Sequence, residues 1–210
     1  MRYLTIALAK GRISDECTEM LESTGLNCSE MKIESRKLIF TDEKNKVKFI
    51  LVKPADVPTY VEYGSSDIGI VGKDVLLEEA RDLYEPLDLG FGICRMAVAG
   101  PYNLDFKSKK AYKVATKFPN ISARYFSSVG MDVKIIKLSG SVELAPLIGL
   151  SDVIVDLVQT GSTLRENGLE IKEVIADISA RVVVNKASMK LENKRIIDII
   201  ERLQSVVKRS

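Results

Sequence analysis

The chain has 210 residues, 46% of them hydrophobic and 29% charged, a balance typical of a globular protein with a buried core. A formal net charge of only +2 argues against a nucleic-acid-binding surface or a polybasic membrane patch. The sequence contains no histidine, so catalysis would have to use acids, cations, hydroxyls or bound metal.

The first half of the chain alternates between strand and helix patterns. We predict a strand at 3–9, a helix that Ser14 caps and Gly25 ends, and a hairpin of strands 37–41 and 47–52. These are followed by a helix at 55–63, which Pro54 opens and Gly64 ends, a strand at 67–72, and a helix from Asp74 to about Asp82. The apolar, glycine-rich segment 89–100 is then expected to be a long strand that crosses into a second unit.

The second half repeats this alternation. Its predicted elements are a strand at 113–116, a helix at 120–129, a strand at 133–138, a helix at 141–150, a strand at 153–155, a long returning strand at 170–185, and a closing helix at 189–207 whose apolar residues are Leu191, Ile196, Ile199, Ile200, Leu203 and Val207.

Alternating strands and helices indicate an α/β fold. We expect two α/β lobes joined by two crossing strands, as in type II periplasmic binding proteins, with a cleft between the lobes. Lobe I would comprise residues 1–90 plus 178–210, and lobe II residues 91–177.

The most informative stretch is residues 143–164, ELAPLIGLSDVIVDLVQTGSTL. The apolar run Val153–Val155 predicts a buried strand of a parallel sheet, ending at Asp156. Thr160–Thr163 would form the strand-to-helix turn, followed by one helical turn that Gly168 ends.

Such a turn suits a phosphate, because the first N–H groups of a helix have no partner within the helix. Gly161 lets the backbone approach closely, and the hydroxyls of Thr160, Ser162 and Thr163 add donors. Asp156 can accept hydrogen bonds from sugar hydroxyls, so phosphate beside ribose is the expected ligand. The alternative is that TGST is simply a helix N-cap after a strand.

Nine positions of this stretch match the signature of the ATP phosphoribosyltransferase family. They are Glu143, Gly149, Ser151, Ile154, Asp156, Thr160, Gly161, Thr163 and Leu164. The chain therefore resembles that family, which performs the first step of histidine biosynthesis. The resemblance implies that N1 of ATP attacks C1 of phosphoribosyl pyrophosphate and that pyrophosphate leaves.

The resemblance also implies three sets of site residues. The catalytic residues would be Lys10, Arg36 and Asp156. The residues that bind phosphoribosyl pyrophosphate would be Asp152, Asp156, Thr160, Gly161, Ser162 and Thr163. The residues on the ATP side would be Lys10, Gly11, Arg12, Lys53, Asp67, Gly140, Ser141 and Glu143.

Lys53 departs from the family, which normally has arginine there, so the planar guanidinium that can bind phosphate through two hydrogen bonds is lost.

The expected cofactor is Mg²⁺, held mainly by the substrate, with no side-chain metal site. The chain resembles the short form of the family, so the expected partners are a second copy of the chain, forming a dimer, and a regulatory subunit similar to histidyl-tRNA synthetase. Neither a nucleic acid nor a membrane is expected as a partner.

A cytoplasmic location is expected for two reasons. Cys17, Cys28 and Cys94 are widely spaced and odd in number, which fits a reducing compartment. The apolar run near the N-terminus is too short for a membrane span and has no small-residue cleavage site, so no signal peptide is expected.

Two other functions fit part of the sequence. One is a small-molecule binding protein of the same two-lobed fold. The other is a nucleotide-salvage phosphoribosyltransferase, which also places acids before a TG-T loop. Those enzymes usually carry two adjacent acids, whereas Leu157 follows Asp156 here.

Overall fold

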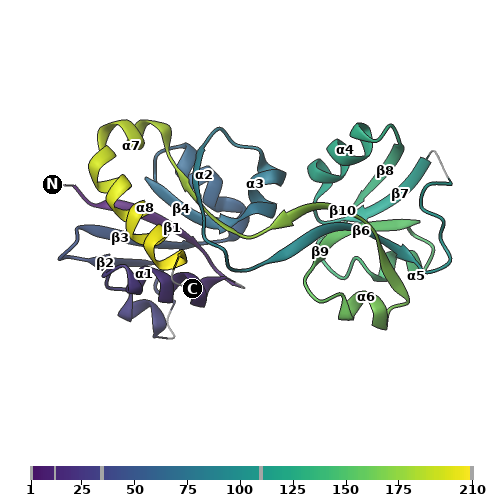
Figure 1. Ribbon diagram of the computed structural model, residues 1–210, viewed down its shortest axis with the longest axis horizontal. Coiled ribbons are helices and arrows are strands. Elements are labelled where there is room, and N and C mark those ends of the chain that lie inside the picture. Colours follow the sequence, from purple (N-terminus) through teal and green to yellow (C-terminus); the bar gives the residue numbers. More distant parts are fainter. Residues whose placement is uncertain (1, 12, 34–35, 109–110, 209–210) are drawn as a thin grey trace. The chain divides into compact units, whose positions relative to one another are not determined.

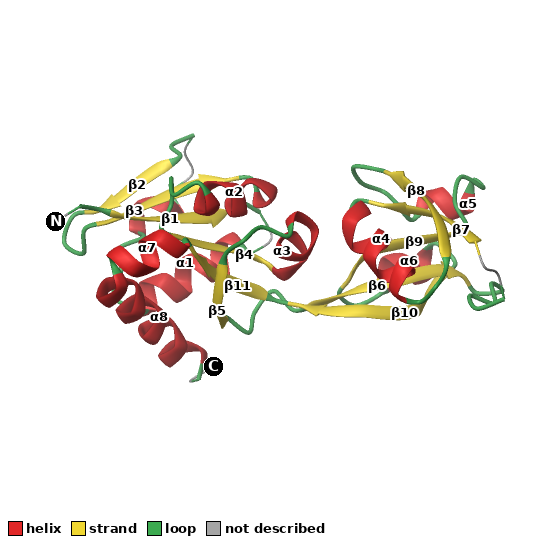
Figure 2. Cartoon of the chain, turned by 90° about the horizontal axis from the view of Figure 1, so that it is seen from above, coloured by secondary structure: helices red, strands yellow, loops and turns green. Residues whose placement is uncertain are grey.

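The protein is described by a computed structural model that covers residues 2–11, 13–33, 36–108 and 111–208 (Figure 1). The chain divides into two compact units, unit 1 (Met1–Gly92 with Ser179–Ser210) and unit 2 (Ile93–Ile178). The sequence had placed the two boundaries after residues 90 and 177. Both units combine helices with a sheet, as an α/β fold requires (Figure 2).

Unit 1 is built on a six-stranded mixed sheet of order β2-β3-β1-β4-β11-β5. Its strands are β1 (Leu4–Ala9), β2 (Ile39–Asp42), β3 (Val47–Val52), β4 (Ile68–Gly72), β5 (Tyr84–Asp88) and β11 (Ala180–Val184). β1 pairs in parallel with β3 and β4, and β2 and β3 form the predicted hairpin. The carboxyl ends of β1, β3 and β4 therefore meet at one edge.

The helices of unit 1 cover both faces of this sheet (Figures 1 and 2). They are α1 (Ser14–Ser23), α2 (Val57–Glu62), α3 (Lys73–Glu79), α7 (Lys186–Leu191) and α8 (Asn193–Val207), with 3₁₀ turns η1 (Ser29–Lys32) and η2 (Pro54–Asp56). α1 and α8 pack together, as do α2 and α3. Gly69 on β4 allows the close approach of α2, because a Cβ there would lie 2.8 Å from side-chain atoms of both Val57 and Val61.

Unit 2 has a five-stranded sheet of order β10-β6-β9-β7-β8. Its elements are β6 (Cys94–Pro101), β7 (Ala111–Thr116), α4 (Pro119–Ser128), β8 (Asp132–Lys137), α5 (Leu144–Leu147), β9 (Val153–Val158), α6 (Ser162–Glu166) and β10 (Leu169–Ile178). β7, β8 and β9 run in parallel, whereas β6 and β10 are antiparallel to their neighbours. A buried cluster that includes Val142, Ile154 and Leu164 joins the α5 and α6 segments to one face of the sheet.

The two predicted crossing strands are both interrupted. Residues 89–93 are not a strand, because Gly90 and Gly92 adopt left-handed φ values of 69° and 63°, so β6 begins only at Cys94. Ser179 separates β10 from β11. β10 pairs with β6 in the sheet of unit 2, whereas β11 pairs with β4 in the sheet of unit 1. The short strand β5 at the edge of the unit 1 sheet was missed, because its exposed sequence YEPLD has no strand pattern.

Four helix predictions also need correction. Ser14 is the first residue of α1 and not its N-cap, because its amide already bonds to the Gly11 carbonyl at 2.9 Å. The helix expected at 141–150 is the four-residue α5, and the helix from Asp74 ends at Glu79. The closing helix is divided into α7 and α8, which leaves Leu191 81% exposed at the break.

Along the described residues, none of the helices combines the length and the apolar character that spanning a membrane requires.

Candidate functional site

The carboxyl ends of the three parallel strands of unit 2 carry most of the predicted ligand-binding residues. From β7 the chain moves to β8 on one side, and from β8 it returns to β9 on the other side of β7. In open α/β sheets, ligands bind outside the carboxyl ends of the strands at such a switch point. The loops that follow β8 and β9 carry Glu143 and Thr160 respectively.

A pocket of about 320 Å³ lies at this edge, within the usual size range of small-molecule sites. Its lining residues are Glu143, Ile154, Asp156, Leu157, Val158, Gln159, Thr160, Gly161, Ser162, Thr163 and Leu164. The structure thus brings together Asp156, Glu143 and the whole predicted loop Thr160–Thr163.

The loop Thr160–Thr163, called the hydroxyl loop below, turns sharply into α6. Gly161 is the N-cap of α6 and has a left-handed φ of 74°, which glycine adopts without steric cost. The Thr160 and Ser162 hydroxyl oxygens lie 3.0 Å apart, and the Ser162 amide donates to Thr160 Oγ1 at 3.4 Å. The hydroxyl loop therefore gathers hydroxyls and backbone amides at the start of a helix, an arrangement suited to a phosphate.

Asp156 lies inside β9 and not at its end, because the strand continues to Val158. Side chains alternate along a strand, so Asp156 shares a face with Ile154 and Val158, which belong to the buried cluster near α5 and α6. The carboxylate is half-buried and lines the same pocket as the hydroxyl loop. The strand extends two residues beyond the predicted end, and Asp156 lines the pocket together with the hydroxyl loop.

Asp152 is not among the residues that line this pocket. It precedes β9, at the amino end of the strand, and its carboxylate accepts a hydrogen bond from the Lys113 amide at 2.8 Å. The six residues of β9 separate it from the hydroxyl loop. Asp152 therefore ties the start of β9 to β7, and that it binds ribose stays a prediction.

Gly140 and Ser141 are exposed in the loop after β8, and neither is among the residues that line the pocket. Ser141 has a φ of 46°, a left-handed conformation that turns the chain toward α5. Within this loop and the start of α5, Glu143 is the predicted residue that reaches the pocket.

In unit 1, the predicted cations lie at the edge of the sheet where the parallel strands β1 and β3 have their carboxyl ends. Lys10 follows β1, and its amide donates to the Val52 carbonyl at the end of β3 at 2.9 Å. Lys53 follows β3 directly, and Gly11 follows Lys10; all three are exposed. Arg12 lies outside the described residues.

Arg36 is exposed and precedes β2. Because β2 is antiparallel to β3, the start of β2 lies beside the carboxyl end of β3. Lys10, Lys53 and Arg36 therefore share one edge of the sheet.

Asp67 lies at the opposite edge, where β4 begins. Its carboxylate accepts hydrogen bonds from Arg2 at 2.7 and 3.0 Å, from the Thr5 amide at 2.8 Å and from the Ser188 hydroxyl at 2.6 Å. Burial alone would raise its pKa, but these hydrogen bonds outweigh burial and hold the pKa of Asp67 below its usual value. Asp67 thus joins the N-terminal segment, β4 and α7. That Asp67 also contributes to the ATP side stays a prediction.

Two residues near these edges were missed from the sequence. Arg165, on α6, donates from Nη1 to the Thr160 carbonyl at 3.1 Å. Asp74 lines a small pocket with Lys10, and its carboxylate lies so close to Gly72 that a Cβ there would be 2.1 Å from Asp74 Oδ1. In the sequence, each is a charged residue that follows a glycine by two to four positions: Asp74 follows Gly72, and Arg165 follows Gly161.

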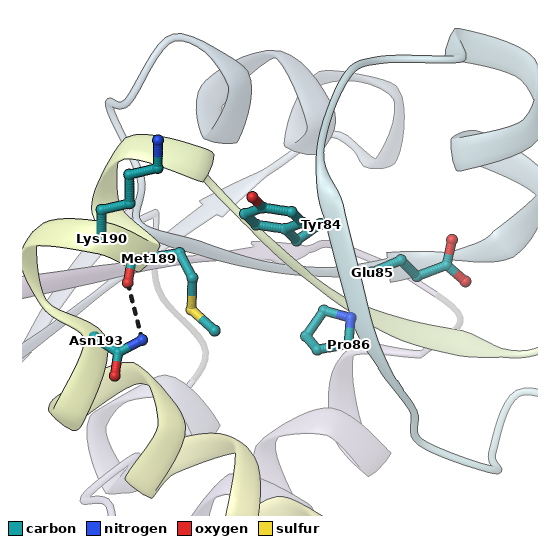
Figure 3. A pocket seen from close by; sticks show the side chains of 6 residues that line it. All are labelled: Tyr84, Glu85, Pro86, Met189, Lys190 and Asn193. Carbon is teal, nitrogen blue, oxygen red and sulfur yellow. Dashed lines mark hydrogen bonds between the residues drawn. The ribbon is translucent and has the colours of Figure 1, made fainter.

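A second pocket of unit 1, of about 430 Å³, lies between β5 and the helices α7 and α8 (Figure 3). Its lining residues are Tyr84, Glu85, Pro86, Met189, Lys190 and Asn193, and the Asn193 amide nitrogen donates to the Met189 carbonyl at 3.2 Å. Tyr84 pairs with Val184, which in turn pairs with Ile68 at the start of β4. This pocket is therefore at the end of the sheet opposite Lys10 and contains none of the predicted site residues.

The switch-point pocket, with its hydroxyl loop and two carboxylates, gives this α/β protein a candidate site for a sugar phosphate. The sequence matches the family model described as ATP phosphoribosyltransferase over residues 53–205. The chain belongs to the ATP phosphoribosyltransferase family.

Curated relatives support this membership along nearly the whole chain. An ATP phosphoribosyltransferase of Ruminiclostridium cellulolyticum is 63% identical over 204 residues, which cover 96% of this chain and 95% of the relative. "ATP phosphoribosyltransferase 2" of Geobacter sulfurreducens is 52% identical, covering 98% of this chain and 99% of the relative.

Two solved structures are similar to the fold. One is the ATP phosphoribosyl transferase (HisG:HisZ) complex from Thermotoga maritima, with a TM-score of 0.87 and 40% identity, covering 99% of this chain and 100% of that chain. The other is the periplasmic aliphatic sulphonate binding protein SsuA from Escherichia coli, with a TM-score of 0.59 and 14% identity, covering 99% of this chain and 73% of that chain. The second likeness concerns the fold alone and confirms the predicted fold, which resembles that of periplasmic binding proteins.

Proposed function

We propose that this protein transfers the phosphoribosyl group of phosphoribosyl pyrophosphate to N1 of ATP, giving phosphoribosyl-ATP and pyrophosphate in the first step of histidine biosynthesis. The observation that carries the proposal is the single pocket that combines Asp156, Glu143 and the hydroxyl loop, in a chain of this family. A pure binding protein and a salvage enzyme are less favoured, because the curated relatives above are named ATP phosphoribosyltransferase.

The hydroxyl loop would hold the 5′-phosphate of the sugar. Thr160 and Ser162 provide hydroxyl donors on the same side of the turn, since their oxygens lie 3.0 Å apart. Small side chains allow the backbone amides to reach the phosphate as well. The phosphate would fix the ribose so that its C1 is held in one position during the reaction.

Asp156 would accept hydrogen bonds from the ribose hydroxyls. When the bond from C1 to pyrophosphate breaks, the ribose acquires oxocarbenium character, and a nearby carboxylate stabilises that positive charge. Asp156 is half-buried, so water screens this attraction less than at an open surface. The attacking nitrogen of ATP already has a lone pair, so no strong base is required, and the absence of histidine from the sequence is no obstacle.

We assign ATP and the departing pyrophosphate to the cations at the carboxyl edge of the unit 1 sheet. Lys10, Arg36 and Lys53 are exposed there and can contact phosphate oxygens. Gly11 would allow a close approach of the backbone, and Arg12 keeps the role implied by the resemblance. In unit 2, Glu143, which lines the pocket, and the neighbouring Gly140 and Ser141 keep the role that the resemblance implies.

Mg²⁺ is the proposed cofactor, and the residues present fit it. Among the described residues, no group of three or more His, Cys, Asp or Glu side chains is arranged to hold a metal ion. Mg²⁺ commonly binds through one or two carboxylates together with substrate phosphates and water, and the pocket offers Asp156 and Glu143. When bound, the ion neutralises charge on the pyrophosphate leaving group.

We further propose that the chain forms a dimer and associates with a regulatory subunit of the HisZ type, similar to histidyl-tRNA synthetase. The similarity to the chain of the Thermotoga maritima HisG:HisZ complex supports the second association. Light scattering of the chain alone tests for the dimer, and light scattering of the chain mixed with such a subunit tests for the complex.

A cytoplasmic location is proposed because Cys17, Cys28 and Cys94 are all free thiols.

The function is tested by incubating the chain with ATP, phosphoribosyl pyrophosphate and Mg²⁺, with and without the regulatory subunit. Mass spectrometry should detect phosphoribosyl-ATP, and pyrophosphate should form in equal amount. EDTA should stop both, and added Mg²⁺ should restore them. Binding without product would favour a binding protein, and product from free adenine instead of ATP would favour a salvage enzyme.

A further inference from the structure

Arg165 lies against the hydroxyl loop but does not line the pocket. Its Nη1 donates to the Thr160 carbonyl at 3.1 Å. A Cβ on Gly161 would lie 3.2 Å from the same nitrogen, so the guanidinium occupies the space that the missing side chain leaves. Among the described residues, no carboxylate lies within ion-pair distance of Arg165, so its bonding is directed at the loop.

The contact between Arg165 and Thr160 determines how one peptide group is oriented. In a trans peptide, the carbonyl of one residue and the N–H of the next point in opposite directions. The Thr160 carbonyl points to the guanidinium, so the Gly161 N–H points away from it. Thr160 and Gly161 line the pocket, whereas Arg165 is not among its lining residues.

We propose that Arg165 is a positioning residue that holds the 160–161 peptide with its N–H, and not its carbonyl, toward the phosphate. This inference rests on the proposed function. Glycine permits many backbone conformations, so the peptide that precedes Gly161 can rotate easily unless something holds it. With the peptide reversed, the partially negative Thr160 oxygen would face the phosphate and weaken its binding.

The first test compares Arg165→Met with the unchanged protein. Methionine keeps an unbranched chain but cannot donate a hydrogen bond. Calorimetry with phosphoribosyl pyrophosphate and Mg²⁺ should show a dissociation constant raised about tenfold, which is the size expected for losing a charge-assisted hydrogen bond. Affinity for ATP should not change. Arg165→Lys should bind within about threefold of the unchanged protein, because its ammonium can still donate to the carbonyl.

A second test separates peptide orientation from simple charge attraction. Salt of about 0.5 M screens exposed charges strongly, so a loss due to charge alone would shrink between about 0.05 M and 0.5 M salt. A loss due to peptide orientation should keep the same ratio at both. Lys134→Met is the matched control, because Lys134 is an exposed cation on β8 of the same unit, away from the hydroxyl loop.

The outcomes are distinct. Unchanged affinity in Arg165→Met, a loss that disappears in high salt, or an equal loss in Lys134→Met would each overturn the role of Arg165 while leaving the proposed function intact. If the unchanged protein itself binds no phosphoribosyl pyrophosphate, the proposed function fails, and the inference fails with it. Thermal melts of all variants should coincide within a few degrees, which excludes unfolding as the cause.

Discussion

The Asp67 carboxylate accepts hydrogen bonds from both terminal nitrogens of Arg2, at 2.7 and 3.0 Å, at the amino edge of the unit 1 sheet. The Asp67 side chain is only 3% exposed, and Thr5 and Ser188 also donate to it. A buried carboxylate with several donors holds together the segments that supply them. We therefore expect Asp67 to contribute to the stability of unit 1.

Asp67→Asn should lower the free energy of unfolding by about 2–4 kcal/mol at neutral pH, because the neutral amide cannot accept all the charge-assisted hydrogen bonds that the carboxylate accepts. The folded protein holds the pKa of Asp67 below its ordinary value, so the stabilisation is present above that ordinary value. It is lost as the pH falls through the lowered pKa. Urea denaturation at several pH values should therefore show the difference shrinking in acid.

Asp82→Asn is the matched control for Asp67→Asn. The Asp82 side chain is 80% exposed, and its ion pair with Lys186 is at the surface. Removing that charge should change stability by less than about 1 kcal/mol. Equal losses in the two variants at neutral pH, or a loss in Asp67→Asn that is constant down to acid pH, would contradict the assignment of Asp67.

Asp156 and Asp152 provide a second pair of acids, one within β9 and one directly before it. Asp156→Asn should weaken the binding of phosphoribosyl pyrophosphate and lower turnover, each by about tenfold or more, because the amide carries no charge to stabilise the sugar. Asp152→Asn should leave both within about threefold, because its carboxylate bonds to the Lys113 amide away from the pocket. Steady-state kinetics with each substrate varied in turn measures both. A larger defect in Asp152→Asn would reverse the assignment.

The hydroxyl loop could be predicted because its information is local. A buried strand, a glycine and three hydroxyl residues follow one another within a dozen positions, and no distant contact is needed to recognise a strand-to-helix turn. The α/β class was equally accessible, since strand and helix patterns alternate along most of the chain.

Asp67 and Asp152 were assigned to ligand sites from the sequence, and the structure places both at the amino edge of a sheet. Each acid comes directly before a strand, so it lies at the amino edge, whereas ligands bind at the carboxyl edge. That rule concerns only chain direction, and it could have been applied to the sequence. The role of Arg165 was less accessible, because its bond to Thr160 depends on the left-handed turn at Gly161.

The breaks in the crossing strands depend on long-range contacts. Ser179 was read as part of a continuous strand, but its carbonyl accepts from the Lys73 amide and its hydroxyl donates to Asp88. These partners lie far away in the sequence and fix the point where the chain leaves one sheet for the other. A local pattern contains no information about them.

The buried cysteines allow a prediction about reactivity. Cys17 and Cys28 are 3% and 1% exposed, and burial raises the pKa of both thiols, that of Cys28 to about 12. Only the thiolate reacts, so at pH 8 neither should be labelled by a maleimide within minutes in the folded protein. Mass spectrometry of the labelled peptides measures this. Both should react fully in guanidinium chloride, and rapid labelling of Cys28 in the native protein would show that the segment around it opens.

Gly161 and Gly168 separate backbone strain from the contact with Arg165. They have φ values of 74° and 67°, so alanine at either position should cost about 1–2 kcal/mol of stability. At Gly161 the new Cβ would also lie 3.2 Å from Arg165 Nη1, whereas at Gly168 nothing lies within 4 Å. Gly161→Ala should therefore weaken binding of phosphoribosyl pyrophosphate by about tenfold beyond Gly168→Ala, while chemical denaturation shows similar losses of stability. Equal affinities in the two variants would mean that the space beside Gly161 has no part in binding.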